Sequence, residues 1–194
     1  MTTAFLLDTC VISETNLPDP DPRIMRFLEA TEQFYLPAGA LIELMMGITQ
    51  VCATNPLKAV KLSAWYHELM RSGLPIVETD RDVIEIMGVL IADNKLKNLW
   101  ERQLNSEGKV TGKPRGGQDL HIAAAALARR LPIATMNVRD FMMIDAIYPL
   151  PGIYDPKEGI WHRRMEPLSE RYPIETANDD NASSTLDLVA PVIG

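Results

Sequence analysis

The chain has 194 residues, of which 46% are hydrophobic and 23% are charged. These proportions are typical of a globular protein with its own core, and they exclude an intrinsically disordered or collagen-like chain. The formal net charge of −7 argues against binding of nucleic acid over a broad basic surface, so any such contact needs a local basic patch, a metal ion or a basic partner.

The two cysteines, Cys10 and Cys52, are too few for a disulfide framework. The first residues lack the basic and apolar regions of a signal peptide. No apolar run reaches the roughly 18 residues that a membrane span needs. We therefore expect reduced thiols in a cytoplasmic protein without a membrane segment.

Hydrophobic periodicity predicts short apolar strands that alternate with amphipathic helices. In chain order, the predicted elements are a strand at 4–7, a helix at 20–30, a strand at 34–37, helices at 40–53 and 58–71, a strand at 74–77, a helix capped by Thr79 or Asp80, a glycine-rich loop at 105–118, a helix at 119–130, and strands at 132–135 and 152–154. This alternation favours an α/β fold with a mostly parallel central sheet and helices on both faces.

The regular pattern extends to about Pro156 and loosens beyond it. We therefore predict one domain over residues 1–156 and a C-terminal extension over residues 157–194. Residues 178–185 are polar and typical of disordered sequence, so we expect the extension to be partly disordered. Trp161 gives the start of the extension an apolar side chain that can pack.

Acidic and amide side chains follow the predicted strands at the edge where a parallel sheet places its ligand site. Asp8 comes directly after the first strand, and Glu43 lies one turn into the helix after the second. Asp119 starts the alanine-rich helix, and Asn137 and Asp140 follow the next strand. Clustered carboxylates repel one another, and without clustered histidine or cysteine ligands they favour Mg²⁺ or Mn²⁺ over zinc.

Each of these acids also has a structural interpretation. An aspartate at a strand end or a helix start is often a helix cap, which contributes about 0.5–2 kcal/mol. Glu43 interrupts an apolar segment, where a charge is costly unless it lies on the solvated stripe of an amphipathic helix. His121 lies two residues after Asp119, on a different side of the helix, and we expect it to be structural.

Four segments of the sequence resemble, in order, the four motifs of PIN-domain proteins of the VapC toxin type. They are residues 5–14, with Asp8; residues 40–48, with Glu43 before a Leu-x-x-Gly-Ile helix; residues 119–125, with Asp119; and residues 134–141, with Asn137 and Asp140. The resemblance implies a PIN-like α/β/α sandwich and a Mg²⁺-dependent endoribonuclease, the toxin of a toxin–antitoxin pair. It also implies a homodimer and a cognate antitoxin protein.

The resemblance assigns the catalytic site to Asp8, Glu43, Asp119 and a fourth polar residue, with Asp8 and Asp119 as metal ligands. The family often has Asp where Asn137 stands, and the Asn137 amide still offers a carbonyl oxygen. Asp140 either supplies the missing charge or orients the site, and the sequence leaves these two roles open. Cys10 stands where the family usually has Asn.

A basic segment leads into Asp119. Residues 95–115 hold six lysines and arginines against two glutamates. Such a segment beside a metal site is suited to binding phosphates, and Trp100 to stacking on a base. The candidate RNA contacts are Lys109, Lys113, Arg115 and Arg139. The alternative is a solvated insertion in which Trp100 anchors a helix.

Two other functions compete with the ribonuclease. One is a PIN-fold module that binds RNA or protein through a weakened, non-catalytic site, which Asn137 and Cys10 favour. The other is a phosphatase of the haloacid dehalogenase type, whose nucleophile and acid/base are aspartates two residues apart. Asp8 fits the first of these positions, but Cys10 occupies the second.

Overall fold

The computed structural model of the chain describes residues 4–101 and 117–164. These residues contain a six-stranded sheet in the order β3-β2-β1-β4-β5-β6. The strands are β1 (Phe5–Leu7), β2 (Phe34–Pro37), β3 (Ile76–Val77), β4 (Ile133–Ala134), β5 (Ile153–Asp155) and β6 (Ile160–Arg163). All neighbouring pairs are parallel except β5 and β6. The predicted mostly parallel α/β sheet is confirmed.

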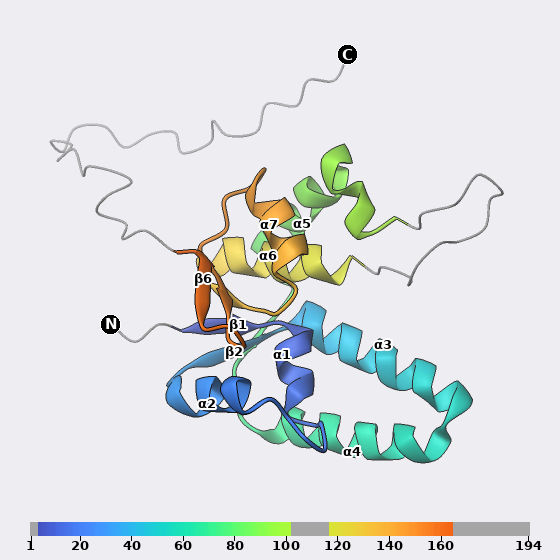
Figure 1. Cartoon of the computed structure of the whole chain (residues 1–194). Helices are drawn as coiled ribbons and strands as arrows, with labels where there is room; N and C mark the ends of the chain where they lie inside the picture. The colour runs from blue at the N-terminus through green and yellow to red at the C-terminus, as the bar shows by residue number, and fades with distance from the viewer. Residues whose placement is uncertain (1–3, 102–116, 165–194) are drawn as a thin grey trace, which may run out of the picture.

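Helices cover both faces of this sheet (Figure 1). They are α1 (Thr9–Glu14), α2 (Pro22–Ala30), α3 (Ala38–Thr54), α4 (Pro56–Arg71), α5 (Arg81–Ala92), the 3-10 helix η1 (Asn94–Leu99), α6 (Gln118–Arg129) and α7 (Val138–Asp145). In Figure 1, α1 and α2 lie below the sheet and α5, α6 and α7 above it. Helices α3 and α4 form an antiparallel pair that projects beyond the sheet.

Side-chain caps explain why several helices begin where they do. The Asp21 carboxylate accepts a hydrogen bond from the Arg23 backbone N–H at the start of α2, and Asn55 caps α4 in the same way. Asp80, rather than Thr79, caps α5 by accepting from the backbone N–H of Val83. Each cap satisfies a backbone donor that the first helical turn leaves unpaired.

The prediction missed α1, η1, α7 and β6. Helix α1 has six residues and α7 has eight, which is too short for a periodic pattern to stand out. Helix η1 lies in the segment that we predicted as a basic insertion, and Leu96 and Leu99 anchor it in the core. Residues 102–116, which hold most of the predicted loop, lie outside the described residues.

Strand β6 falls within the segment that we assigned to the C-terminal extension. It pairs with β5, and Gly159 in the connecting turn has φ +70°, a conformation that favours glycine. The Trp161 ring stacks on Phe5, with the ring centroids 5.5 Å apart. The paired sheet therefore continues past residue 156, and residues 165–194 lie outside the described part of the chain.

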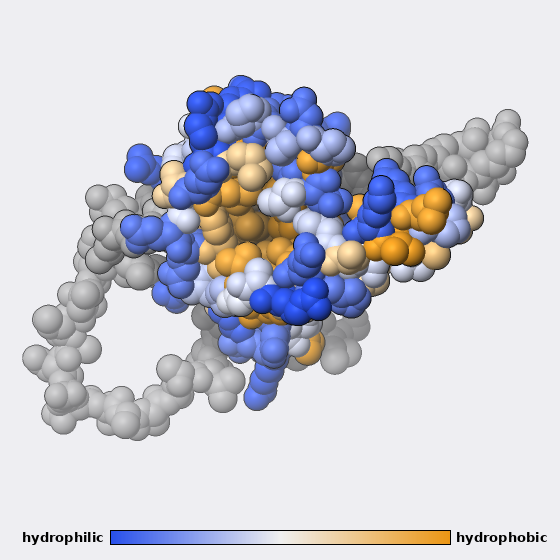
Figure 2. All heavy atoms as spheres, turned by 90° about the horizontal axis from the view of Figure 1, so that it is seen from below, coloured by the Kyte–Doolittle hydropathy of each residue, from blue (hydrophilic) through white to orange (hydrophobic). Residues whose placement is uncertain are grey.

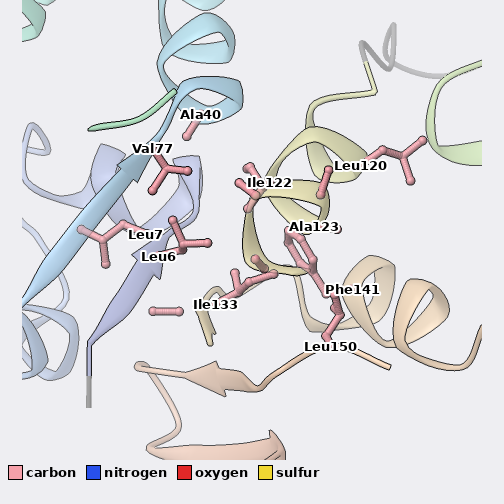
Figure 3. Close-up of a cluster of buried hydrophobic side chains, with 14 of the residues drawn as sticks. Leu6, Leu7, Ala40, Val77, Leu120, Ile122, Ala123, Ile133, Phe141 and Leu150 are labelled. Carbon is pink, nitrogen blue, oxygen red and sulfur yellow. The ribbon is translucent and has the colours of Figure 1, made fainter. Parts of the chain in front are cut away.

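One large part of the core lies between the sheet and α6 (Figure 3). Leu6 and Ile133 from the sheet and Ile122 and Phe141 from the helices are fully buried. Residues 123–126 of α6 are four consecutive buried alanines. Their small side chains let the helix approach the sheet closely, which fixes the position of Asp119 in its first turn.

His121 packs tightly between α6 and the start of α3, in agreement with the structural role expected for it. The side chain is buried, and its Nε2 lies 2.8 Å from the Thr79 hydroxyl. Burial lowers the pKa of the imidazole and favours its neutral form. A Cβ at Gly39 would lie 2.7 Å from His121 Nδ1. Gly39 therefore lets α3, which carries Glu43, approach the helix that carries Asp119.

Two glycines of α3 are expected to respond in opposite ways to alanine. Gly47→Ala should stabilise the fold by about 0.5–1 kcal/mol, because its Cβ would meet nothing within 4 Å and alanine is the better helix former. Gly39→Ala should destabilise it by about 1–3 kcal/mol through overpacking against His121. Urea unfolding of both variants checks this contrast. Equal midpoints would show that the α3–α6 contact is looser than described.

The surface of α3 and α4 is partly apolar. Exposed side chains on these helices include Ile42, Met45, Met46, Leu57 and Val60. Seen from below, the molecule shows an apolar hollow that hydrophilic residues surround (Figure 2). Among the described helices, none combines the length and apolarity needed to cross a membrane.

Candidate active site

Asp8 lies at the point where β1 passes into α1. Its backbone N–H donates to the carbonyl of Ala134 in β4 at 3.0 Å, so the strand pairing continues to this residue. Its side chain accepts from the Thr9 backbone N–H at 2.6 Å and caps α1. It also accepts from the Thr135 hydroxyl at 2.6 Å and the Cys10 thiol at 3.0 Å. Asp8 is therefore both a helix cap and the centre of a hydrogen-bond network.

The carboxyl of Asp8 is buried, with 3% of its surface exposed. Burial raises its pKa above the ordinary value, although the three hydrogen bonds favour the charged form, and nearby Asp140 raises the pKa further. Burial also raises the pKa of the Cys10 thiol, so the thiol stays protonated and donates a hydrogen bond to the Asp8 carboxylate. A buried acid beside another acid gains from a positive charge, so a cation is suited to this position.

Asn137 joins the two other aspartates of the predicted site. Its amide nitrogen lies 3.4 Å from Asp119 Oδ1 and 3.3 Å from Asp140 Oδ2. Its backbone N–H donates to the Thr135 hydroxyl at 2.8 Å. Thr135 thus connects Asn137 to Asp8. The structure brings both Asn137 and Asp140 to the site, at the N-terminal end of α7.

Glu43 reaches the same region from α3. Its Oε2 accepts a hydrogen bond from the Thr9 hydroxyl at 2.7 Å. Partial burial raises the pKa of Glu43, the bond from Thr9 lowers it, and the charge of Asp8 raises it. Neither Glu43 nor Asp8 forms an ion pair with a lysine or arginine of the described residues. Glu43 therefore places another carboxylate near Asp8, and no basic residue of the described part of the chain neutralises it.

The site opens into a cleft of about 1520 Å³ between the α1, α3 and α4 side and the η1, α6 and α7 side. Glu43, Asp119, Asn137 and Asp140 line the cleft. Asp8 lies buried behind them, connected through Thr135. All five predicted catalytic residues thus lie in or directly behind one cleft at the carboxyl edge of the sheet, as expected for a parallel sheet.

The structure describes only some of the residues predicted to contact RNA. Arg139 is exposed and lines the cleft beside Asp140. Trp100 is partly buried and packs against the core, which agrees with the anchoring alternative. Lys109, Lys113 and Arg115 lie outside the described residues, so their contacts stay predictions.

The atoms of the site that could coordinate a metal fit a cation that prefers oxygen ligands. They are carboxylate oxygens and one amide, and the nearest thiol, Cys10, is held by Asp8. Within residues 4–101 and 117–164, no three acidic, histidine or cysteine side chains are grouped closely enough to form a ready metal site. The Asn137 amide holds Asp119 and Asp140 by donating to both. Rotation of that amide would turn its oxygen, instead of its nitrogen, toward a bound cation.

Thr9 and Thr135 belong to the site but were missed in the sequence. Each uses a hydroxyl to orient a carboxylate, Glu43 and Asp8 respectively. Both residues stand inside the motifs quoted above: Thr9 begins α1 two residues after β1, and Thr135 directly follows β4. That position was the available signal, but a threonine at a strand end is too common to indicate a site by itself.

Thr135→Val is expected to disturb the site while keeping the shape of the side chain. The change removes the donor to Asp8 and the acceptor for the Asn137 N–H, in a residue with no exposed surface. We expect a loss of about 1–3 kcal/mol in the free energy of unfolding and weaker binding of Mg²⁺. Chemical denaturation and calorimetry measure the two effects. Thr135→Ser, which keeps the hydroxyl, should retain both properties, and equal losses in both variants would contradict this role.

Comparison with known proteins identifies the fold around these residues. The family model of the PIN domain matches residues 5–145. The chain belongs to the PIN-domain family. The match covers Asp8, Glu43, Asp119, Asn137 and Asp140, so the whole acidic cluster lies inside the PIN domain.

Individual relatives of this PIN domain are toxins and toxin–antitoxin complexes. The chain is 28% identical to Toxin FitB of Neisseria gonorrhoeae over 159 residues, which cover 81% of this chain and 98% of FitB. A structure of FitAB bound to a DNA fragment is 25% identical, with a TM-score of 0.53 over 79% of this chain and 95% of that one. VapBC2 from Rickettsia felis, bound to a promoter DNA fragment, shares the fold at 20% identity and a TM-score of 0.50, over 79% of this chain and all (100%) of that one.

Membership of the PIN-domain family argues against the alternative that the chain is a phosphatase of the haloacid dehalogenase type. The geometry at Cys10 agrees, because the position two residues after Asp8 holds a buried thiol that donates to Asp8. That thiol has no acid/base role of the kind a second aspartate would have. The PIN-domain alternative with a weakened site stays open at this point.

Proposed function

We propose that this PIN domain is a Mg²⁺-dependent endoribonuclease that acts as the toxin of a toxin–antitoxin pair. The observation that carries the proposal is the buried Asp8, connected through Thr135 to the Asp119–Asn137–Asp140 group at one cleft. The resemblance to FitB supports the toxin assignment. Mn²⁺ has the same preference for oxygen ligands and is expected to substitute for Mg²⁺.

Each residue has a proposed role. Asp8 and Asp119 would hold the cation, and Asn137 and Asp140 would complete its surroundings. A bound divalent cation would activate a water and neutralise the charge that develops on the phosphate. Glu43, whose pKa is raised by partial burial, is placed at the cleft wall to orient that water and take up its proton. Arg139 is placed to bind a phosphate next to the one that is cleaved.

The proposed protein partners are a cognate antitoxin and a second copy of the chain. The net charge of −7 and the acids of the cleft suit a basic antitoxin segment. An apolar groove of about 590 Å³ on α3 and α4, which shares Met46 and Gln50 with the cleft, offers a surface for a homodimer. Its lining residues are Ala38, Leu41, Ile42, Met45, Met46, Thr49, Gln50 and Tyr66.

The proposed function is tested by incubating the purified full chain with total RNA in Mg²⁺, in Mn²⁺ and in EDTA. Discrete fragments in either metal and intact RNA in EDTA are the expected result. Fragmentation that EDTA leaves unchanged would contradict a metal-dependent site. Intact RNA under all three conditions would contradict the nuclease.

A PIN-fold binding module without catalysis is the second candidate. The Asn137 amide favours it, because an uncharged bridge reduces the negative charge available to a cation. This candidate predicts that the chain binds RNA or a protein partner but leaves RNA intact at every Mg²⁺ and Mn²⁺ concentration. Calorimetry without heat of metal binding would support it.

A further inference from the structure

The cleft continues well beyond the acidic residues. At the end away from Asp119 and Asp140 its wall includes the first turns of α4, which contribute Lys58 and Lys61, while Trp65 lines the cleft from further along α4, beside Thr15. Nothing in the proposed cleavage step uses these three residues. They nevertheless share one continuous cleft with the acids, so a chain-like ligand bound at the acids can extend to them.

The distance along the helices separates the two ends of the cleft. Helices α3 and α4 are antiparallel and joined at Asn55, and the cleft lining on α3 runs from Glu43 to Val51. These two residues are eight positions apart, which corresponds to about 12 Å along the helix axis. Lys58 and Lys61, at the beginning of α4, therefore lie toward the Val51 end of the cleft and are placed to contact a phosphate other than the one that is cleaved.

Lys58 and Lys61 give this end of the cleft a positive charge. They are three residues apart and so lie on one face of α4. Both are exposed, and neither forms an ion pair within the described part of the chain. Glu101, a further acid of the lining, is paired with Lys97 at 3.2 Å. The chain as a whole is acidic, so these lysines form a local basic patch of the kind that an acidic nucleic-acid-binding protein needs.

Trp65 adds an aromatic surface beside the lysines. Its indole nitrogen donates to the Thr15 hydroxyl at 3.3 Å, which fixes the ring against α1. The side chain is partly buried and lines the cleft. Lysines that contact phosphates next to an aromatic ring that stacks on bases are the usual combination for single-stranded nucleic acid.

We propose that Lys58, Lys61 and Trp65 form a second binding surface for single-stranded RNA, distal to the acids, which holds the strand on one side of the cleavage point. The proposal rests on the proposed function for the choice of RNA. We call these three residues the α4 surface. RNA is favoured over an acidic peptide because the α4 surface pairs cations with an aromatic ring and is continuous with a site that suits phosphodiester cleavage.

The test measures RNA binding rather than cleavage. The full chain with Asp8→Asn, in EDTA, is titrated into a fluorescently labelled single-stranded RNA of about 12 nucleotides over a series of salt concentrations. Adding Lys58→Gln and Lys61→Gln should weaken binding about tenfold. It should also reduce the slope of log K against log salt by about 1.4, because two phosphate contacts on a single strand are lost.

A matched control separates a local contact from the general loss of charge. Arg26 and Arg71 are exposed, lie outside the cleft lining and are unpaired within the described residues. Changing both to glutamine removes the same charge and should leave the salt slope unchanged. An equal loss in this control, or an unchanged slope in the lysine variant, would overturn the proposal while the proposed function stands.

A steric variant tests the path between the two ends. Gly47 lines the cleft between Glu43 and Val51, and a Cβ there would meet nothing within 4 Å. Gly47→Phe should therefore fold but weaken RNA binding about tenfold by narrowing the path, whereas Gly47→Ala should bind as the parent does. Equal binding by both variants would overturn a strand path along α3.

Two further outcomes are decisive. Poly-glutamate that binds the α4 surface more tightly than the RNA does would make it a site for acidic peptides and overturn the proposal. Absence of any RNA binding by the parent chain would overturn it as well. Metal-dependent cleavage of total RNA by the unsubstituted chain then decides separately whether the proposed function has also failed.

Discussion

Asp8→Asn is expected to lower RNA cleavage by at least about 10³-fold, equivalent to about 4 kcal/mol in the activation barrier, while the chain keeps its fold. The substitution removes a charge that would hold the cation, but it keeps the size of the side chain and one oxygen acceptor. That oxygen can still accept from the Thr9 N–H and cap α1. Initial rates of fragment formation at saturating Mg²⁺ measure the loss, and circular dichroism checks the fold.

The same variant also has an expected effect on stability without metal. Burial raises the pKa of Asp8 above its ordinary value of 3.8, so the folded chain binds this proton to a higher pH than the unfolded chain does. The stability that protonated Asp8 contributes is then lost as the pH rises from about 4 through the folded-state pKa. Asp8→Asn does not titrate.

We therefore expect the thermal midpoint of Asp8→Asn in EDTA, relative to the unsubstituted chain, to increase as the pH rises from about 4 through the folded-state pKa of Asp8. Asp145→Asn is a useful control, because Asp145 is a half-buried acid that lies outside the cleft and accepts from the Leu150 N–H. A midpoint difference for Asp8→Asn that stays constant or falls with pH would contradict the burial cost assigned to Asp8. Residual cleavage near the original rate would contradict its catalytic role.

Asn137→Asp is expected to make the fold less stable without metal and more responsive to it. The change removes the amide that donates to both Asp119 and Asp140 and adds a third carboxylate between them. Loss of two hydrogen bonds and added repulsion should lower the free energy of unfolding in EDTA by about 1–3 kcal/mol. A higher ligand charge should in turn tighten Mg²⁺ binding by about tenfold.

The measurement for Asn137→Asp is the thermal midpoint as a function of Mg²⁺ concentration. Binding to the folded state alone raises the midpoint, so the variant should gain more from the metal than the unsubstituted chain does. Asn16→Asp adds the same charge at another point of the cleft lining and serves as the control. If both variants respond to Mg²⁺ alike, Asn137 does not lie at the cation site.

The strand-end acids were the part of the site that the sequence predicted best. Asp8 and Asp119 stand next to a strand end and a helix start that periodicity locates, and the topology of a parallel sheet then brings them to one edge. Glu43 could be found because a charge within an apolar helical segment is energetically costly unless the charge has a specific partner or role. In the structure, that partner is Thr9 at the cleft wall.

Other features depend on tertiary packing and left no local signal. The bridging role of Asn137 requires Asp119 and Asp140 to arrive from different helices, which no spacing in the chain expresses. Strand β6 follows a loosened pattern, and the contact of Trp161 with Phe5 explains why it still joins the sheet. In the sequence, Lys58 and Lys61 have the pattern of ordinary solvated lysines. Only the packing of α4 against α3 brings them to the cleft.

The most direct test of the acidic cluster as a ribonuclease site is to map the ends of the RNA fragments that the purified chain produces in Mg²⁺, with Asp8→Asn prepared in the same way as the blank. Attack of water on phosphorus with the 3′ oxygen as leaving group predicts fragments with 5′-phosphate and 3′-hydroxyl ends, absent from the blank. Fragments with 2′,3′-cyclic phosphate ends, or the same fragments from Asp8→Asn, would contradict hydrolysis at this site.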